Sequence, residues 1–319
     1  MLVNGKWTTD WQPVQKADAE GRFLRQTSSF RNWVTPDGSA GATGEGGFKA
    51  EPGRYHLYVA LICPWASRTL IGRKLKKLDE VISVSVVEPA LTEQGWRFGD
   101  YPGADRDEVN GATYMHELYT RADPEISGRA TVPVLWDRQR GTIVNNESAD
   151  ILRMMNSGFG DLADSAFDLY PADLQVQIDA LNASIYPRFN NGVYRAGFAT
   201  SQKAYEEAFQ EVFATLDEVE ESLGDGRGFL LGERLTEADV RLFVTLVRFD
   251  VAYHGLFKCN LRRIADYPRL SAYLDRFLGV PGVRETVNID HIKRGYYSIK
   301  ALNPTGIVPV GPALPKALA

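Results

Sequence analysis

A strand that delivers a cysteine directly onto the start of a helix constrains this sequence more than any other feature. Residues 55–62 form an apolar run, YHLYVALI, which is followed at once by Cys63 and Pro64. Proline is well tolerated at the first helical position, because its missing N–H would have no partner there. The free N–H groups and the positive dipole end of that first turn favour Cys63 as a thiolate. The junction predicts an enzyme that works through one thiol.

The alternative is that Cys63 is an ordinary core residue, since unpaired cysteines are among the most buried residue types. The surrounding pattern favours the reactive thiol. Residues 67–78 carry apolar side chains at helical spacing, with basic side chains between 73 and 77 expected to face water. A second strand is expected at 81–87, so that strand, helix and strand form a parallel βαβ unit. Ala66 replaces the second cysteine of a CxxC pair, so the partner thiol is expected to come from solution.

Composition excludes several other classes of protein. A net charge of -5 argues against general nucleic-acid binding. The two cysteines, Cys63 and Cys259, are too few for a disulfide scaffold and fit a reducing compartment, and Cys259 is expected to be a core residue. The four histidines are not spaced as metal ligands, so we expect no metal. Because we recognise neither a signal peptide nor a membrane span, we expect a cytoplasmic protein.

Further strands are expected at 131–137 and 142–146. Pro133 would interrupt the ladder of a central strand, which leaves two interpretations: an edge strand, or a cis proline that holds a sharp bend. Glu147 and Ser148 open the next helix. Between the second and third strands lies a long polar and aromatic stretch, 88–129, and connections of this length are often functional.

The second half of the sequence is predicted to be helical from about residue 161. A helical stripe of apolar residues runs from Tyr205 to Leu223. Thr236 and Asp239 have the spacing of a capping box, and the run after them is apolar nearly all round. This helix is therefore expected to be buried, with Asp239 as a structural acid. At the other end of the chain, an irregular arm is rich in glycine and serine. Its aromatic residues, which we expect to pack on other parts of the chain, are Trp7, Trp11, Phe23, Phe30 and Trp33.

Taken together, these features resemble the glutathione transferase superfamily, and within it the Xi class, the glutathionyl-hydroquinone reductases. The resemblance covers about residues 48–312. It rests on the order of CPWA at 63–66, YMHELY at 114–119, RATVPVLWD at 129–137, GVYRAGFA at 192–199, FKCN at 257–260, DHIKR at 290–294 and NPTGIVP at 303–309. One departure is Gly295, which stands where some relatives carry a histidine.

The resemblance implies an α/β, thioredoxin-like N-terminal domain followed by an all-α C-terminal domain. The expected boundaries are an N-terminal arm over 1–47, a thioredoxin-like glutathione-binding domain over 48–160, an all-helical domain over 161–290 and a tail over 291–319 that packs back on the fold. Because members of the family are dimers built through their helical domains, we also expect a homodimer.

By the same resemblance, the substrate is a hydroquinone that carries a glutathionyl thioether. The Cys63 thiolate attacks the glutathione sulfur and the hydroquinone leaves, and a second glutathione then releases oxidised glutathione from the mixed disulfide. Tyr194, Tyr253 and Tyr296 match the tyrosines that line the hydroquinone pocket of the family, with Tyr297 as a substitute for Tyr296. For each, the alternative is a buried tyrosine whose hydroxyl pairs with the backbone.

Glutathione, as co-substrate, needs groups that bind its peptide backbone and its charges. A cis bond between Val132 and Pro133 would turn the Val132 backbone toward the cysteinyl part of the ligand. Glu147 suits the ammonium of the γ-glutamyl end, and Ser148 with the helix N–H groups suits its carboxylate.

Two further residues, Trp96 and Arg129, match positions that line the glutathione site in the family. The alternatives are loop packing for Trp96 and a surface ion pair for Arg129.

Two other functions compete with this one. An omega-like thioltransferase or dehydroascorbate reductase would also use a cysteine in this position, but the long 88–129 stretch and the NPT segment at 303–305 argue against it. A non-enzymatic glutathione-transferase-like interaction module would need no thiol at the junction, so Cys63 argues against that function.

Overall fold

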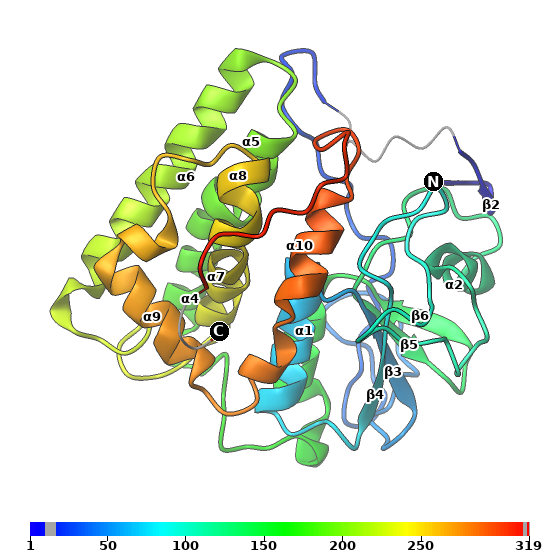
Figure 1. Ribbon diagram of the computed structural model, residues 1–319. Coiled ribbons are helices and arrows are strands. Elements are labelled where there is room, and N and C mark those ends of the chain that lie inside the picture. Colours follow the sequence, from blue (N-terminus) through cyan, green and yellow to red (C-terminus); the bar gives the residue numbers. More distant parts are fainter. Residues whose placement is uncertain (10–16, 315–317, 319) are drawn as a thin grey trace. The chain divides into compact units, whose positions relative to one another are not determined.

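The computed structural model describes residues 1–9, 17–314 and 318 (Figure 1). It divides into two compact units. The first contains the described residues of 1–12, 26–167 and 286–295, and the second contains those of 13–25, 168–285 and 296–319. Parts of the N-terminal arm therefore belong to each unit. The domain boundaries expected from the sequence remain a prediction.

The first unit is built on a four-stranded sheet in the order β4-β3-β5-β6. The strands are β3 (Tyr55–Val59), β4 (Ile82–Val86), β5 (Val134–Asp137) and β6 (Thr142–Asn145). β3 and β4 are parallel and are joined by α1 (Pro64–Leu75), which confirms the predicted βαβ unit, while the other two pairs are antiparallel.

The interpretation of residues 131–137 as an edge strand is wrong, because β5 lies inside the sheet. The Val132–Pro133 bond is cis, as the alternative interpretation had it. β5 begins at Val134, so that Pro133 stays outside the ladder and removes no hydrogen bond from it.

The remaining elements of the first unit are short. A hairpin is formed by β1 (Leu2–Val3) and β2 (Lys6–Trp7), and the helices after α1 are α2 (Met115–Ala122), α3 (Ser148–Arg153), η1 (Met154–Gly158) and η2 (Gly160–Leu162). α2 lies in the stretch that was expected to be a long connection. Its start is held by Glu117, whose carboxylate accepts the backbone N–H groups of Thr113 and Tyr114, both at 3.2 Å.

Close packing joins α1 to α3. A Cβ atom at Gly72 would lie 2.6 Å from Cδ1 of Leu152, which is fully buried, so only glycine allows the two helices to approach this closely. Both helices begin at residues predicted to be functional. The close contact between the two helices therefore fixes Cys63, at the start of α1, relative to Glu147 and Ser148, at the start of α3.

Not all of the basic side chains at the end of α1 face water, as had been expected. Lys76 is buried, and its ammonium group donates to the carbonyl of Phe167. Arg73 donates to the carbonyl of Ile82 at 2.6 Å and forms an ion pair with Asp79. The turn after α1 leaves carbonyl groups that need donors, and long basic side chains supply them while burying their aliphatic stems.

The second unit is helical. Its elements are α4 (Gln175–Ile185), η3 (Tyr186–Asn190), α5 (Gly192–Gly197), α6 (Gln202–Ser222), η4 (Leu223–Asp225), α7 (Glu237–Arg248), η5 (Phe249–Tyr253), α8 (His254–Leu256), η6 (Ile264–Asp266) and α9 (Pro268–Leu278). η7 (Arg284–Thr286) and α10 (Ile289–Tyr297) follow, and the division between the units crosses both. α3, α4 and α7 each continue into a π-helical turn, η1, η3 and η5.

The capping box predicted for the buried helix is present at the start of α7. The Asp239 carboxylate accepts the backbone N–H and the hydroxyl of Thr236, at 2.8 and 3.0 Å. It also accepts Leu230 N–H at 2.8 Å and the Tyr273 hydroxyl at 2.9 Å. Four donors in a fully buried site confirm that Asp239 is a structural acid.

Three aromatic residues of the arm pack on other parts of the chain, as predicted. Trp7 stacks on His116 with ring centroids 4.5 Å apart, and the Phe30 ring meets that of Tyr119 edge-on at 5.8 Å. In the second unit, Phe23 stacks on Phe198 at 5.8 Å. The contact of the Trp33 indole, which donates to the Thr43 hydroxyl at 2.8 Å, lies within the arm itself. Trp11 lies outside the described residues.

Candidate active site

Cys63 lies where the sequence places it, as the residue that caps the N-terminus of α1, with Pro64 in the first helical turn. Its backbone is extended, with φ of -77° and ψ of 120°, and its carbonyl accepts the N–H of Ser67 at 3.0 Å. The thiol is partly exposed. A sulfur atom at a helix N-terminus lies at the positive end of the helix dipole, which stabilises negative charge on it.

The loop before β5 lies against this thiol. The Cys63 Sγ donates to the carbonyl of Val132 at 3.6 Å. Tyr119 of α2 holds the loop in place: its hydroxyl donates to the carbonyl of Thr131 at 2.9 Å and accepts the Thr131 N–H at 3.2 Å. The Asn146 side chain donates to the same hydroxyl at 3.0 Å. Val132, Pro133 and the thiol are thus brought together.

Glu147 and Ser148 lie at the start of α3. The Glu147 carboxylate caps this helix by accepting the Ala149 N–H at 3.1 Å, and its other oxygen accepts the Ser28 hydroxyl at 2.9 Å. Ser148 is buried, and its hydroxyl accepts from Nη1 of Arg68 at 3.4 Å. Glu147 therefore has a structural role besides any contact with a ligand.

Arg68 is a residue that sequence reasoning missed. It is 1% exposed, and its guanidinium lies 4.5 Å from the centre of the Trp65 ring while reaching Ser148. A buried cation beside a helix N-terminus strengthens that terminus as a site for a carboxylate. A basic residue within the otherwise uncharged stretch 64–72 was the only local signal, and its contact with Ser148, 80 positions away, left no trace in the sequence.

Trp96 and Arg129 are positioned by backbone contacts. The carbonyl of Trp96 accepts the N–H of Met115, at the start of α2, at 2.9 Å. The N–H of Arg129 donates to the side chain of Gln26 at 3.2 Å. Both side chains are partly exposed, and both lie in the same unit as Cys63.

The three tyrosines predicted to serve the aromatic substrate lie together in the second unit. The Tyr296 hydroxyl is within hydrogen-bond distance of two others, at 2.6 Å from that of Tyr194 and 2.7 Å from that of Tyr253. The rings of Tyr194 and Tyr253 are 5.9 Å apart. The hydroxyl of Tyr297, the possible substitute for Tyr296, instead lies beside Gly255, 3.1 Å from the point that a Cβ atom on this glycine would occupy.

Exposure distinguishes the members of this tyrosine triad, Tyr194, Tyr253 and Tyr296. Tyr253 and Tyr296 are buried, whereas Tyr194 is partly exposed. Burial raises the pKa of Tyr253 and of Tyr296 well above the ordinary value of a phenol, so both remain protonated at neutral pH. The triad is therefore a chain of hydrogen-bonded hydroxyls in which Tyr194 is the partly exposed member.

The absence of a histidine at position 295 has a packing reason. A Cβ atom on Gly295 would lie 2.4 Å from Cδ1 of Ile62 and 2.7 Å from the carbonyl oxygen of Pro89. No side chain fits there without moving the residue that precedes Cys63.

Cys259 is fully buried, and its thiol lies 3.9 Å from the carbonyl oxygen of Phe257. Burial raises the pKa of the Cys259 thiol to about 12, which keeps it protonated and unreactive.

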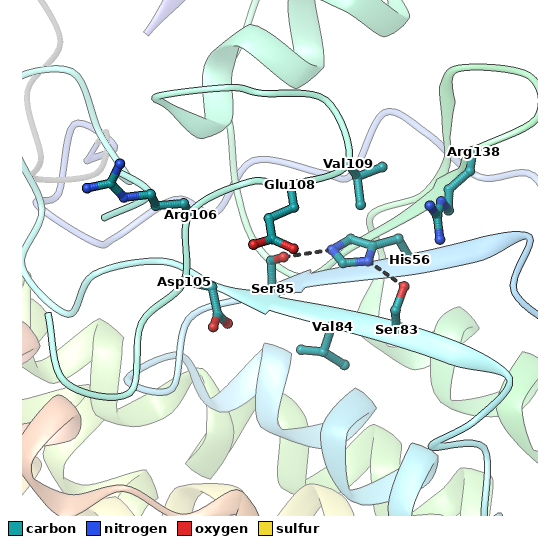
Figure 2. Close-up of a pocket in the computed structure, with 9 residues that line it drawn as sticks. All are labelled: His56, Ser83, Val84, Ser85, Asp105, Arg106, Glu108, Val109 and Arg138. Carbon is teal, nitrogen blue, oxygen red and sulfur yellow. Dashed lines mark hydrogen bonds between the residues drawn. The ribbon is translucent and has the colours of Figure 1, made fainter. Parts of the chain in front are cut away.

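A polar pocket of about 380 Å³ lies elsewhere in the first unit (Figure 2). Its floor is His56 of β3, whose ring nitrogens lie 2.7 and 3.0 Å from the hydroxyls of Ser83 and Ser85 on β4. Glu108 and Arg138 are at its rim. The nine residues that line it include none of those predicted to bind glutathione.

For residues 1–9, 17–314 and 318, we find no cluster of three or more His, Cys, Asp or Glu side chains placed to hold a metal ion. Within the same ranges, the helices are too short or too polar to cross a membrane.

Comparison with known proteins finds two family models on this chain. The model described as "Glutathione S-transferase, N-terminal domain" matches residues 62–157, and "Glutathione S-transferase, C-terminal domain" matches 202–276. Glutathionyl-hydroquinone reductase YqjG of Escherichia coli is 53% identical, over 98% of this chain and 94% of its own. Glutathionyl-hydroquinone reductase PcpF of Sphingobium chlorophenolicum is 51% identical, over 99% of this chain and 97% of its own.

Solved structures agree with these matches. The glutathione-bound structure of the Escherichia coli YqjG protein has a TM-score of 0.91 and 50% identity, covering 100% of this chain and 97% of that one. The Xi glutathione S-transferase of Phanerochaete chrysosporium has a TM-score of 0.88 and 47% identity, covering 94% and 97%.

Proposed function

Because the chain belongs to the Xi class of glutathione transferases, the glutathionyl-hydroquinone reductases, it is a glutathione-dependent enzyme, and we propose that it reduces glutathionyl-hydroquinones through a mixed disulfide on Cys63. The observation that carries this proposal is one partly exposed thiol at a helix N-terminus, in contact with the carbonyl of Val132. A single reactive thiol has no second cysteine to resolve the disulfide, so a second glutathione does this.

The first half-reaction begins with the substrate in its keto tautomer, in which the ring carbon bonded to sulfur also carries a hydrogen. The Cys63 thiolate attacks the glutathione sulfur, an S–S bond forms, and the C–S bond breaks. The electron pair of that bond passes to the substrate oxygen, which becomes a phenolate. A tyrosine hydroxyl stabilises this oxyanion and gives it a proton.

In the second half-reaction, the thiolate of a free glutathione attacks the glutathione sulfur of the mixed disulfide. Oxidised glutathione leaves and the Cys63 thiolate is restored. One substrate and one glutathione are therefore converted into one hydroquinone and one oxidised glutathione. The expected kinetics are ping-pong, because the hydroquinone leaves before the second glutathione reacts.

We propose Tyr194 as the hydroxyl that meets the substrate, because it is the partly exposed member of the triad. Tyr296 then supports Tyr194 through their 2.6 Å contact, and Tyr253 supports Tyr296 in turn. A chain of hydroxyls polarises its terminal donor cooperatively, so that negative charge on the substrate oxygen is shared among the three phenols.

For glutathione itself, we propose that the Val132 backbone pairs with the cysteinyl part and that Ser148 and the start of α3 bind the γ-glutamyl carboxylate, with Glu147 taking its ammonium. The contact between Arg68 and Ser148 supports an anionic group at this position. Pro133, Trp96 and Arg129 complete the proposed glutathione site.

The test is an assay of purified protein with glutathionyl-hydroquinone and glutathione. We expect release of free hydroquinone much faster than the reduction of hydroxyethyl disulfide. Quenching during turnover with one equivalent of substrate should trap one added glutathione on Cys63, visible by mass spectrometry of the peptide. Rapid disulfide reduction without hydroquinone release would identify a thioltransferase instead.

We also propose that the enzyme is a cytoplasmic homodimer joined through its helical domain. The two cysteines and the need for reduced glutathione support a reducing compartment, and family membership supports the dimer. Light scattering coupled to gel filtration should give twice the mass of one 35.5 kDa chain. A mass that stays at that of one chain at high protein concentration would contradict the dimer.

A further inference from the structure

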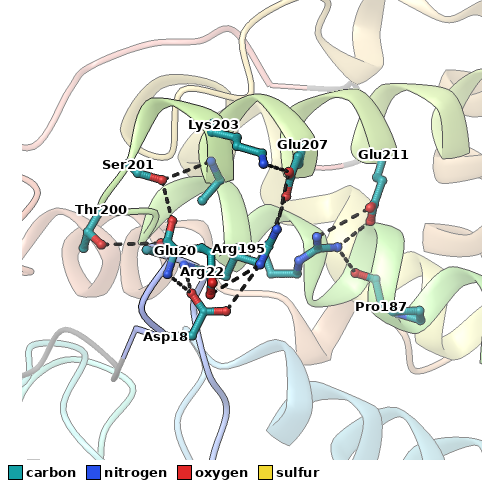
Figure 3. A network of polar contacts seen from close by, with 12 residues as sticks. Asp18, Glu20, Arg22, Pro187, Arg195, Thr200, Ser201, Lys203, Glu207 and Glu211 are labelled. Carbon is teal, nitrogen blue, oxygen red and sulfur yellow. Dashed lines mark hydrogen bonds and ion pairs between the residues drawn. The ribbon is translucent and has the colours of Figure 1, made fainter.

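A short segment of the N-terminal arm, residues 18–25, is tied to α5 and α6 in the helical unit (Figure 3). The N–H of Thr200 donates to the carbonyl of Gly21 at 3.0 Å, and the hydroxyl of Ser201 donates to the carbonyl of Glu20 at 2.7 Å. Arg22 forms an ion pair with Glu207 of α6, with Nε and Oε2 3.0 Å apart. The segment is thus held by its backbone and by a charge pair.

This attachment places two side chains of the arm on Tyr194. Phe23 is buried, and its ring stacks on that of Tyr194 with centroids 6.5 Å apart. The Arg25 guanidinium lies 4.8 Å from the centre of the Tyr194 ring and 5.2 Å from that of Phe23. Nε of Arg25 donates to Oδ1 of Asn191 at 2.8 Å, and Asn191 caps the short helix that carries Tyr194.

A guanidinium held over an aromatic ring is attracted to its electron-rich face, and the attraction grows when the ring gains negative charge. A phenol gains such charge when its hydroxyl gives a proton, or part of one, to an oxyanion. The cation over Tyr194 therefore stabilises the transition state of hydroquinone release more than the ground state, which is the condition for a rate effect. The bond to Asn191 fixes the cation, so that little reorganisation is needed during the reaction.

We propose that Arg25 is a positioning residue for reduction of the aromatic substrate: held by Asn191, it fixes the Tyr194 ring and stabilises charge that builds up on the phenol. This inference rests on the proposed function, since it concerns the step in which Tyr194 acts on the substrate. It assigns the arm segment a part in the reaction, because Arg22 and Glu207 keep Arg25 in place.

The test compares Arg25→Met with Arg25→Lys. Arg25→Met removes the charge but keeps an extended side chain over the ring, and we expect kcat for hydroquinone release from glutathionyl-hydroquinone to fall about tenfold. The KM for this substrate and the rate of hydroxyethyl disulfide exchange, which needs Cys63 but not Tyr194, should stay within about twofold of wild type. Arg25→Lys restores a cation without the planar fork and should recover part of the lost kcat.

Arg195→Met is the matched control, because it removes a cation that pairs with Glu211 between the same two helices. It should leave kcat for hydroquinone release near that of wild type. Glu207→Gln, which weakens the attachment of the arm without changing Arg25, should lower kcat in the same direction as Arg25→Met, but less.

The inference is overturned if Arg25→Met leaves kcat unchanged, if it slows both reactions equally, or if Arg195→Met has the same effect. A purely structural role would slow both reactions together. Failure of the proposed function looks different, because the wild-type enzyme itself would then release no hydroquinone.

Discussion

The two cysteines show how position decides the chemistry of a thiol. Cys63 is partly exposed and caps a helix, whereas Cys259 is fully buried with its pKa raised to about 12 by that burial. The sequence distinguished them through the strand before Cys63 and the proline after it. The roles of Arg68, Tyr119 and Ser28 could not be predicted in the same way, because each depends on a contact with a residue far away in the sequence. These partners are Ser148, 80 positions from Arg68, Thr131, 12 positions from Tyr119, and Glu147, 119 positions from Ser28.

We predict that Cys63→Ala abolishes hydroquinone release, because no other thiol can form the mixed disulfide. Cys259→Ala should keep most of the activity and lower the free energy of unfolding by about 1–2 kcal/mol, since it leaves a small cavity in the core. Turnover assays and urea unfolding on both variants check this. Equal loss of activity in the two variants would contradict the assignment of Cys63.

Tyr194→Phe should slow hydroquinone release by about tenfold or more, because it removes the partly exposed donor of the triad. Exchange with hydroxyethyl disulfide should be nearly unchanged, since a thiolate leaving group needs no proton from a phenol. Parallel assays of the two reactions measure the difference. If both slow alike, Tyr194 is structural.

At the level of elements, the strands and long helices followed from local patterns. The βαβ unit, the helix after Glu147 and the capping box at α7 were all predictable, because each depends on residues within a few positions of one another. α2 was missed although Met115, Leu118 and Tyr119 fall at helical spacing, because it is only eight residues long and lies within a stretch interpreted as a connection. The π-helical turns were not predictable, since a single extra residue in a turn leaves little trace in hydrophobic periodicity. The place of β5 inside the sheet depends on pairing with both neighbours, which no local pattern records.

The cap of α7 provides a test at this scale. Asp239→Ala should lower the free energy of unfolding by about 3 kcal/mol, because it leaves four buried donors, on Leu230, Thr236 and Tyr273, without their acceptor. Asp266→Ala is the matched control: it removes a capping box of the same spacing, formed with Arg263, at the surface. Its effect in urea unfolding should be much smaller. An equal loss of unfolding free energy in the two variants would mean that burial does not make the Asp239 cap more stabilising than a surface cap.

For the whole molecule, His56 predicts how stability depends on pH. Burial lowers the pKa of His56 from 6.5 to about 4, and the ring is 3% exposed. The unfolded chain therefore binds a proton at a higher pH than the folded one. Above pH 6.5, His56 is neutral in both states and costs no stability. As the pH falls toward 4, protonation of His56 in the unfolded chain lowers the free energy of unfolding by up to about 3 kcal/mol.

Urea unfolding of the wild type and of His56→Gln at several pH values between about 7 and 4 measures this contribution. The variant should be less stable at neutral pH but should show a shallower decline as the solution is acidified. Identical slopes for wild type and His56→Gln would mean that other groups dominate acid unfolding.

The π-helical turn η5 has a consequence for how this chain can change over evolutionary time. A π turn holds one residue more than the α-helix around it, and η5 ends on Tyr253. Deleting the extra residue would return this turn to regular α-helical winding, in which the helix on either side keeps its facing. The phenol of Tyr253 would then still meet Tyr296, whereas the same deletion in a regular helix turns everything downstream by about 100° around the helix axis. A single-residue deletion within 249–252 should accordingly be tolerated better than one within the regular turns of α7.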